Sequence, residues 1–109
     1  MRIGTDIIEI SRIAESLKLK GFADHVYTRS ELEYYEQSGA RAETLAGVFC
    51  AKEAGGNAAF IASRLIYILT LCEQKRPYVK ICAAKYVSVK AVVSISHCRE
   101  YATAVCVAE

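Results

Sequence analysis

The feature that most constrains the fold of this chain is a long helix-forming segment at about residues 40–62, in which alanine, leucine and phenylalanine dominate. Its apolar positions, among them Leu45 and Phe49, predict a buried helix. The pair Gly55-Gly56 lies inside this segment and costs about 2 kcal/mol relative to alanine. The pair therefore indicates a kink, an early end of the helix, or close approach of another backbone or a ligand.

The segments around this helix determine the fold class. One short helix is expected from the cap Ser11 to Gly21, and a second from Thr28 to about residue 37, with Thr28 and Glu31 forming a capping box. Five strands are expected, at residues 2–10, 65–72, 78–81, 92–97 and 101–107, the last two forming a hairpin. Because strands and helices do not alternate regularly, the pattern predicts an α+β fold with an antiparallel sheet packed on one long helix plus shorter helices.

Length and composition indicate one globular domain spanning residues 1–109. Hydrophobic residues make up 53% and charged residues 24%, which excludes a disordered chain. The longest apolar run, residues 65–72, is too short to cross a bilayer, and the N-terminus does not resemble a signal peptide, so we expect a cytoplasmic protein. The five cysteines are an odd number with no Cys-x-x-Cys, which favours reduced thiols over disulfides or a zinc site.

The net charge of +2 does not by itself indicate binding to nucleic acid. Its distribution is uneven, because basic residues but no carboxylates lie between Glu73 and Glu100. This stretch either attracts a polyanion or an acidic protein, or is an ordinary solvated rim.

A carboxylate interrupts the apolar strand expected at residues 2–10. The period of two places Asp6, Ile8 and Ile10 on one side and Ile3, Thr5, Ile7 and Glu9 on the other. Aspartate is depleted from strands and costly to bury alone, so Asp6 requires a cation or hydrogen-bond donors.

A second carboxylate, Glu53, lies on the long helix. It shares one helix face with Phe49 and Asn57, whereas Lys52 is turned away by about 100°. Two interpretations stay open: an ion pair of Asp6 or Glu53 with Lys52 or Arg12, or a shared Mg²⁺ site with open positions for water and phosphate oxygens.

A histidine ends the strand expected at residues 92–97. Alternation places His97 on the side of Val93 and Ile95, with Ser94 and Ser96 facing the other way. An imidazole at that position can donate to a phosphate, ligate a metal, or satisfy a carbonyl.

Four motifs resemble, in order and approximate spacing, the holo-acyl-carrier-protein synthase family, the small class of 4′-phosphopantetheinyl transferases. The motifs are Gly4-x-Asp6-Ile7-x-Glu9-Ile10-x-Arg12-Ile13, Tyr27-Thr28-x-x-Glu31, Ala46-Gly47-x-Phe49-x-Ala51-Lys52-Glu53-Ala54, and Ser94-Ile95-Ser96-His97 followed by Tyr101-Ala102-x-Ala104. Together they cover nearly the whole chain, so the resemblance is more specific than any single motif.

The resemblance implies a phosphopantetheinyl transferase fold and an enzyme that moves the 4′-phosphopantetheine arm of coenzyme A onto a serine of apo acyl carrier protein, releasing adenosine 3′,5′-bisphosphate. By the family pattern, Asp6 and Glu53 are Mg²⁺ ligands and catalytic residues, with Glu53 the candidate to assist removal of the serine proton. The resemblance also implies homotrimers with active sites between subunits. The remaining roles it implies are coenzyme contacts from Lys52, His97, Ser96 and Asn57, and a carrier contact from Arg12.

The chain also departs from the family pattern on the coenzyme side. Asn57 stands where the family has a second lysine, and Val48 stands where it often has an arginine. The Gly-Thr-Gly loop expected after the long helix is absent, and Lys75-Arg76-Pro77 replaces a Gly-Lys-Pro turn. A catalytically impaired homologue that binds coenzyme A or carrier protein without transfer is therefore an alternative, and a structural oligomer in which Asp6 and Glu53 form ion pairs is a third.

Overall fold

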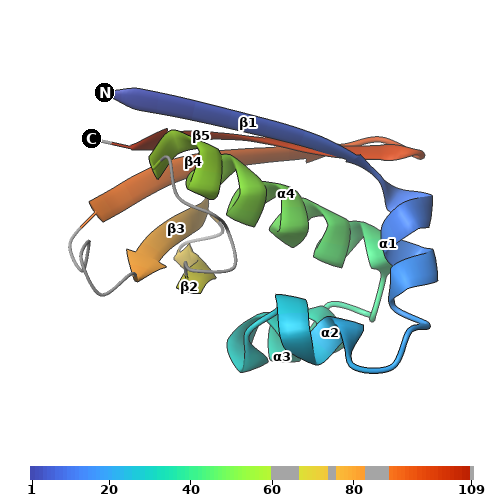
Figure 1. Ribbon diagram of the computed structural model, residues 1–109. Helices are drawn as coiled ribbons and strands as arrows, with labels where there is room; N and C mark the ends of the chain where they lie inside the picture. Colours follow the sequence, from blue (N-terminus) through green and yellow to red (C-terminus); the bar gives the residue numbers. More distant parts are fainter. Residues whose placement is uncertain (60–66, 74–75, 83–88, 109) are drawn as a thin grey trace.

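The computed structural model describes residues 1–59, 67–73, 76–82 and 89–108 of the 109-residue chain. Figure 1 shows the order of its elements along the chain. They are β1 (Arg2–Glu9), α1 (Ile10–Ser16), α2 (Phe22–Val26), α3 (Arg29–Gln37), α4 (Ala42–Ala59), β2 (Tyr67–Glu73), β3 (Arg76–Cys82), β4 (Val89–His97) and β5 (Tyr101–Ala108).

The strands form one antiparallel sheet in the order β1-β5-β4-β3-β2. The first and last strands of the chain are neighbours, so the two termini lie close together at one end of the sheet (Figure 1). Helix α4 lies along one face of the sheet, α1 lies at its N-terminal end, and α2 and α3 lie on the side of α4 away from the sheet. The predicted α+β class, with an antiparallel sheet on one long helix, is confirmed.

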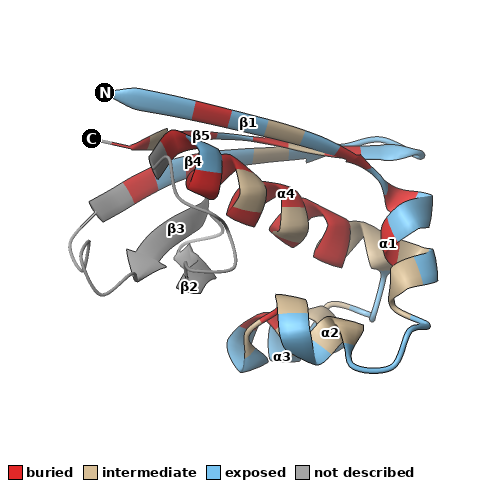
Figure 2. Ribbon diagram, viewed as in Figure 1, coloured by how far each residue is buried: buried red, intermediate tan, exposed pale blue. Residues whose placement is uncertain are grey.

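The core lies between α4 and the sheet, as the buried positions in Figure 2 show. Small side chains dominate the contact: Ala51, Ala54 and Ala58 of α4 are fully buried. Gly4 of β1 meets the backbone of α4 so closely that a Cβ there would clash with the carbonyl oxygen of Ala54 and lie 2.5 Å from the nitrogen of Ala58. The alanine-rich composition of α4 therefore lets strand and helix backbones approach each other.

Most of the predicted elements are confirmed, with boundaries shifted by a few residues. The alternation of β1 is as predicted, because Gly4 and Ile8 are buried and Asp6 is half-buried, whereas Ile3 and Ile7 are exposed. Helix α4 continues through Gly55 and Gly56 to residue 59, so the pair does not mark an early end of the helix. The expected extension to residue 62 lies outside the described residues.

The cap of the first helix was predicted wrongly. Helix α1 begins at Ile10, with Glu9 as an N-cap that makes no side-chain hydrogen bond, so Ser11 is already inside the helix. It ends at Ser16, and a separate short helix, α2, follows Gly21, which has a φ of 83°.

The capping box of α3 is confirmed. The Thr28 backbone N–H donates to Glu31 Oε1 at 2.8 Å, and the Glu31 N–H donates to Thr28 Oγ1 at 3.2 Å. The predicted β4–β5 hairpin is confirmed too, closed by a 2.9 Å bond from the Cys98 N–H to the Tyr101 carbonyl. Within the described part of the chain, no helix is both long and apolar enough to cross a membrane.

Candidate active site

Asp6 and Glu53 come from the two elements that touch most closely. Asp6 is on the face of β1 that carries Gly4 and Ile8, and Glu53 adjoins Ala54, whose carbonyl faces Gly4. Both carboxylates are half-buried. Loss of solvent raises the pKa of Asp6, and the nearby negative charge of Glu53 raises it further. The structure therefore brings these two acids within electrostatic reach of each other.

A buried thiol lies beside this pair. The Cys50 Sγ, one turn before Glu53 on α4, donates to the Ala102 carbonyl at 3.3 Å. Burial raises the pKa of Cys50 to about 12, and the charge of Asp6 and a hydrogen bond to its side chain act in the same direction. The thiol is thus a neutral donor, and its bond to Asp6, with that from the backbone N–H of Ile7, opposes the rise in the pKa of Asp6.

The donor set fits a hard divalent cation. Mg²⁺ is commonly held by one or two carboxylates, with waters and substrate phosphates in the other positions. Asp6 and Glu53 supply two such carboxylates, and their mutual repulsion in a partly desolvated place is what a bound cation would relieve. Among the described residues there is no group of three or more His, Cys, Asp or Glu side chains that could hold a metal on its own.

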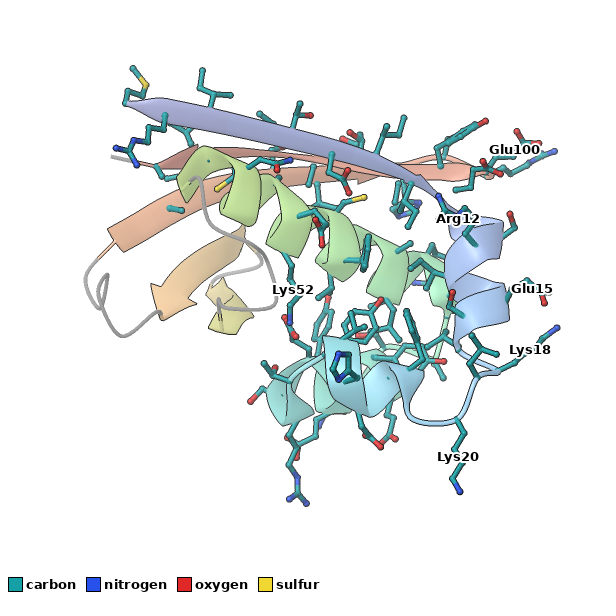
Figure 3. The ribbon with its side chains drawn as sticks, in the orientation of Figure 1. Arg12, Glu15, Lys18, Lys20, Lys52 and Glu100 are labelled. Atoms are coloured by element: carbon teal, nitrogen blue, oxygen red, sulfur yellow. The ribbon has the colours of Figure 1, made fainter. Side chains whose placement is uncertain are left out.

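Lys52 lies elsewhere. Its side chain points from α4 toward α3, away from the sheet (Figure 3). The Nζ atom is 2.7 Å from Glu31 Oε1, and the two side chains are buried together. The ion pair of Lys52 is therefore made with Glu31, and its predicted contact with a phosphate stays a prediction.

His97 and Ser96 lie on opposite faces of β4. His97 pairs with Ala102 in the register, on the face that carries the buried Val93, and its side chain is exposed at the end of the strand. The side shared with Val93 is as the alternation predicted, and the register shows that it is also the face of the sheet on which Asp6 lies. Ser96 is exposed on the outer face, so one chain does not bring it to the carboxylate pair.

Asn57 connects α4 to β1. Its Nδ2 atom donates to the Thr5 carbonyl at 3.1 Å, one residue before Asp6, and the side chain is otherwise exposed. Asn57 is one turn beyond Glu53, so it borders the carboxylate pair as the helix periodicity predicted.

Arg12 is exposed on α1, at the end of the molecule where the β4–β5 hairpin also lies (Figure 3). Among the residues that the structure describes, no ion pair between Arg12 and Asp6 is recorded. A cavity of about 490 Å³ adjoins this region, between the β1–α1 junction and the hairpin, and is lined by Glu9, Ile10, Ser11, Arg99, Glu100 and Tyr101.

Comparison with known proteins decides the family. The sequence profile of the 4′-phosphopantetheinyl transferase superfamily matches residues 2–106. The chain belongs to this superfamily. It is similar to proteins named holo-[acyl-carrier-protein] synthase, with 39% identity over 116 residues to that of Fusobacterium nucleatum, covering 96% of this chain and 95% of the relative. Identity to the Bacillus subtilis protein of that name is 42% over 115 residues, covering 98% and 93%.

Solved structures of transferases with the same name share the fold. The Neisseria meningitidis protein superposes with a TM-score of 0.80 at 28% identity, covering 99% of this chain and 97% of that one. The Helicobacter pylori protein, solved in complex with coenzyme A, superposes with a TM-score of 0.78 at 26% identity, covering 98% and 99%. The resemblance inferred from the four motifs is thereby confirmed.

Three residues that support the candidate site were not predicted in these roles from the sequence. Cys50 was treated only as a reduced thiol, and the packing role of Gly4 was not noticed. Glu31 was predicted only as a cap, although a buried carboxylate needs a partner in addition. The signal for Gly4 was present, because a glycine inside a strand indicates close approach of another backbone.

Proposed function

We propose that this transferase moves the 4′-phosphopantetheine group of coenzyme A to a serine hydroxyl of apo acyl carrier protein in a Mg²⁺-dependent reaction. In this step the serine oxygen bonds to the phosphorus that carries the pantetheine arm. The bond from that phosphorus to adenosine 3′,5′-bisphosphate breaks, and the serine proton passes to a base. The observation that carries the proposal is the convergence of Asp6 and Glu53, in a chain of this family, on the same side of the sheet.

In the proposed site, Asp6 and Glu53 hold the Mg²⁺, which when bound neutralises charge on the pyrophosphate of coenzyme A. The acids are supported by their surroundings, because Cys50 and the Ile7 N–H both donate to Asp6. Glu53 is half-buried and is the residue proposed to accept the serine proton.

His97 contacts a phosphate of the coenzyme in this proposal, since it is exposed on the face of the sheet that carries Asp6. Asn57 contributes an amide at the C-terminal end of α4, next to the carboxylate pair. Ser96 faces outward, so its proposed coenzyme contact belongs to a site completed by another subunit.

We propose that the chain assembles as a homotrimer through the outer face of β1, β5 and β4. This face carries large apolar side chains that are exposed in one chain: Ile3 at 68%, Ile7 at 65%, Val92 at 66% and Val105 at 40%. A contiguous apolar patch of this kind indicates a protein interface. In light scattering coupled to gel filtration, Ile7→Glu should yield monomers. The control Leu19→Glu changes another exposed surface and should leave the trimers intact. A monomeric wild type would refute the proposed assembly.

We propose that the acidic carrier protein docks on α1. Arg12 is exposed there, and Lys18 and Lys20 follow on the same side of the molecule (Figure 3). Complementary charge steers such encounters and makes the association rate depend on salt. The protein is proposed to act in the cytoplasm, where Cys50, Cys98 and Cys106, all free thiols, would stay reduced.

The test is to incubate the protein with apo acyl carrier protein, coenzyme A and Mg²⁺ and to weigh the carrier by mass spectrometry. The carrier should gain one phosphopantetheine arm, and the gain should be lost in Asp6→Asn and Glu53→Gln. Glu33→Gln is the matched control, because this carboxylate is exposed on α3 and pairs only at the surface with Arg29, at 3.5 Å. Equal rates in all four proteins would remove the carboxylate pair from the mechanism.

An impaired homologue that binds without transfer is the second candidate. It is favoured by the amide at Asn57, which is bonded to Thr5, and by Val48, which is only 4% exposed and offers no phosphate contact. The place of the absent Gly-Thr-Gly loop and the segment Lys75-Arg76-Pro77 lie outside the residues whose side chains are described. No mass gain, together with calorimetric binding of coenzyme A, would favour this candidate.

A further inference from the structure

The motif Tyr27-Thr28-x-x-Glu31 has no part in the proposed chemistry, yet each of its polar side chains acts at the contact between α3 and α4. The Tyr27 hydroxyl donates to the Leu45 carbonyl of α4 at 2.9 Å. Thr28 and Glu31 form the capping box that begins α3. Glu31 Oε1 then accepts from Lys52 Nζ of α4 at 2.7 Å, and this ammonium also lies 5.9 Å from the centre of the Tyr27 ring.

Lys52 is enclosed in this contact. The residue is 7% exposed and Glu31 is 1% exposed, so the ion pair is removed from water. A coenzyme phosphate could reach the ammonium only if Lys52 left Glu31, which would break a buried ion pair. Separation of such a pair is strongly unfavourable, so the geometry argues against a direct phosphate contact from this chain's Lys52.

We propose that Lys52 is a positioning residue that acts through Glu31, and that the pair fixes the rotation of α4 about its own axis. Lys52 and Glu53 are neighbours on the helix and point about 100° apart. When Lys52 is held against α3, Glu53 is held toward β1 and Asp6. This inference rests on the proposed function, because it assigns the pair to the orientation of a proposed metal ligand.

The test is a double-mutant cycle of Lys52→Met, Glu31→Gln and the double variant, with Arg29→Met as the control. Glutamine retains an oxygen that can complete the capping box, and methionine retains most of the volume of lysine. Arg29 forms an exposed pair with Glu33 at 3.5 Å, with side chains 94% and 61% exposed, so its loss should change neither the melting temperature nor the rate measurably.

Two measurements follow for each protein: the melting temperature, and kcat and KM for coenzyme A at a temperature well below every melting transition. Lys52→Met should lower the melting temperature by at least about 10 °C, and the double variant should recover much of that loss because both members of the buried ion pair are then replaced. In both single variants kcat should fall by about 10-fold or more while KM for coenzyme A stays within about twofold, as expected when a reacting group is displaced.

The alternatives give different results. If Lys52 binds a phosphate, Lys52→Met raises KM for coenzyme A strongly, Glu31→Gln does not, and the double variant is no better than Lys52→Met; the positioning role is then overturned. If folded Lys52→Met keeps the wild-type kcat, the pair serves stability alone and the role is again overturned. An inactive wild type would overturn the proposed function and this role together. If the wild type is active, a negative result with the Lys52 and Glu31 variants counts against the positioning role alone.

Discussion

The contact between β1 and α4 leads to our sharpest prediction, on Gly4→Ala. A Cβ on Gly4 would clash with the Ala54 carbonyl oxygen and lie 2.5 Å from the Ala58 nitrogen. Nonpolar atoms pack comfortably at about 3.5 Å or more, so strand and helix would have to separate by about 1 Å. Both obstacles are backbone atoms that cannot turn aside. We therefore expect the upper part of the overpacking range, about 3 kcal/mol of lost unfolding free energy.

The same displacement should reach the site. Gly4 is two residues from Asp6, and Ala54 follows Glu53, so separation of the two backbones also separates the two carboxylates. A misplacement of about 1 Å at a reacting centre typically costs on the order of 100-fold in rate. The melting temperature should fall by more than about 10 °C, and kcat, measured below the transition, should fall by about 100-fold.

Gly47→Ala is the matched control for this prediction. The new Cβ would lie 3.0 Å from Ile95 Cγ2, which belongs to a side chain that can rotate, and alanine favours the helix by about 1 kcal/mol over glycine. The melting temperature of this variant should stay within about 5 °C of the wild type. Equal losses in the two variants, or wild-type behaviour of Gly4→Ala, would show that the close approach of the two backbones does not hold the site together.

Three further predictions concern the site and its surface. Asp6→Asn should abolish transfer yet raise the melting temperature at pH 8. Because burial raises the pKa of Asp6, its ionisation opposes folding as the pH rises. The gain in melting temperature should therefore shrink toward pH 4, and a gain that is the same at both pH values would contradict the argument. If position 57 faces the pyrophosphate, Asn57→Lys should tighten the binding of coenzyme A measured by calorimetry by up to about 10-fold. The control Asn57→Ala loses only the exposed hydrogen bond to Thr5. Identical affinities of the lysine variant and the wild type for coenzyme A would place the pyrophosphate elsewhere. Arg12→Glu should lower kcat/KM for carrier protein at low salt, and its difference from the wild type should narrow at high salt. Arg29→Glu, which changes an exposed arginine on α3, should not lower kcat/KM. Equal losses in the two variants would mean that the overall charge of the protein, and not a docking site on α1, determines the rate.

Local patterns predicted those parts of the fold that depend on neighbouring residues. The period of two assigned the faces of β1 correctly, and Thr28 with Glu31 predicted a capping box that forms with both of its hydrogen bonds. The start of α1 was missed because a distant contact decides it. The Ile10 N–H donates to the Glu100 carbonyl at 2.8 Å, and the helix therefore begins before Ser11 can cap it. A cap contributes only about 1 kcal/mol, which a tertiary hydrogen bond can offset.

The pairing of Asp6 with Glu53 followed from chemistry and from the family resemblance, but the physical means of their approach did not. A helix can carry a carboxylate to a strand only if the two backbones are allowed to come close. The absent side chain of Gly4 and the small ones of Ala54 and Ala58 allow this approach. The sequence contained each of these residues, yet the register between β1 and α4, which brings them together, is a property of the folded chain.

Lys52 shows why adjacency in sequence misleads in a helix. Next to Glu53 it looked like part of the same site, but residues one position apart on a helix face different neighbours. Once Glu53 is turned toward β1, Lys52 must face another element, and here that element is α3, with the carboxylate of Glu31 at its first turn. Both charges are buried. The ion pair therefore stabilises each of them more than contact with a ligand would. A lysine beside a site carboxylate should therefore be assigned to a phosphate only after its own helix face has been examined for a buried acid.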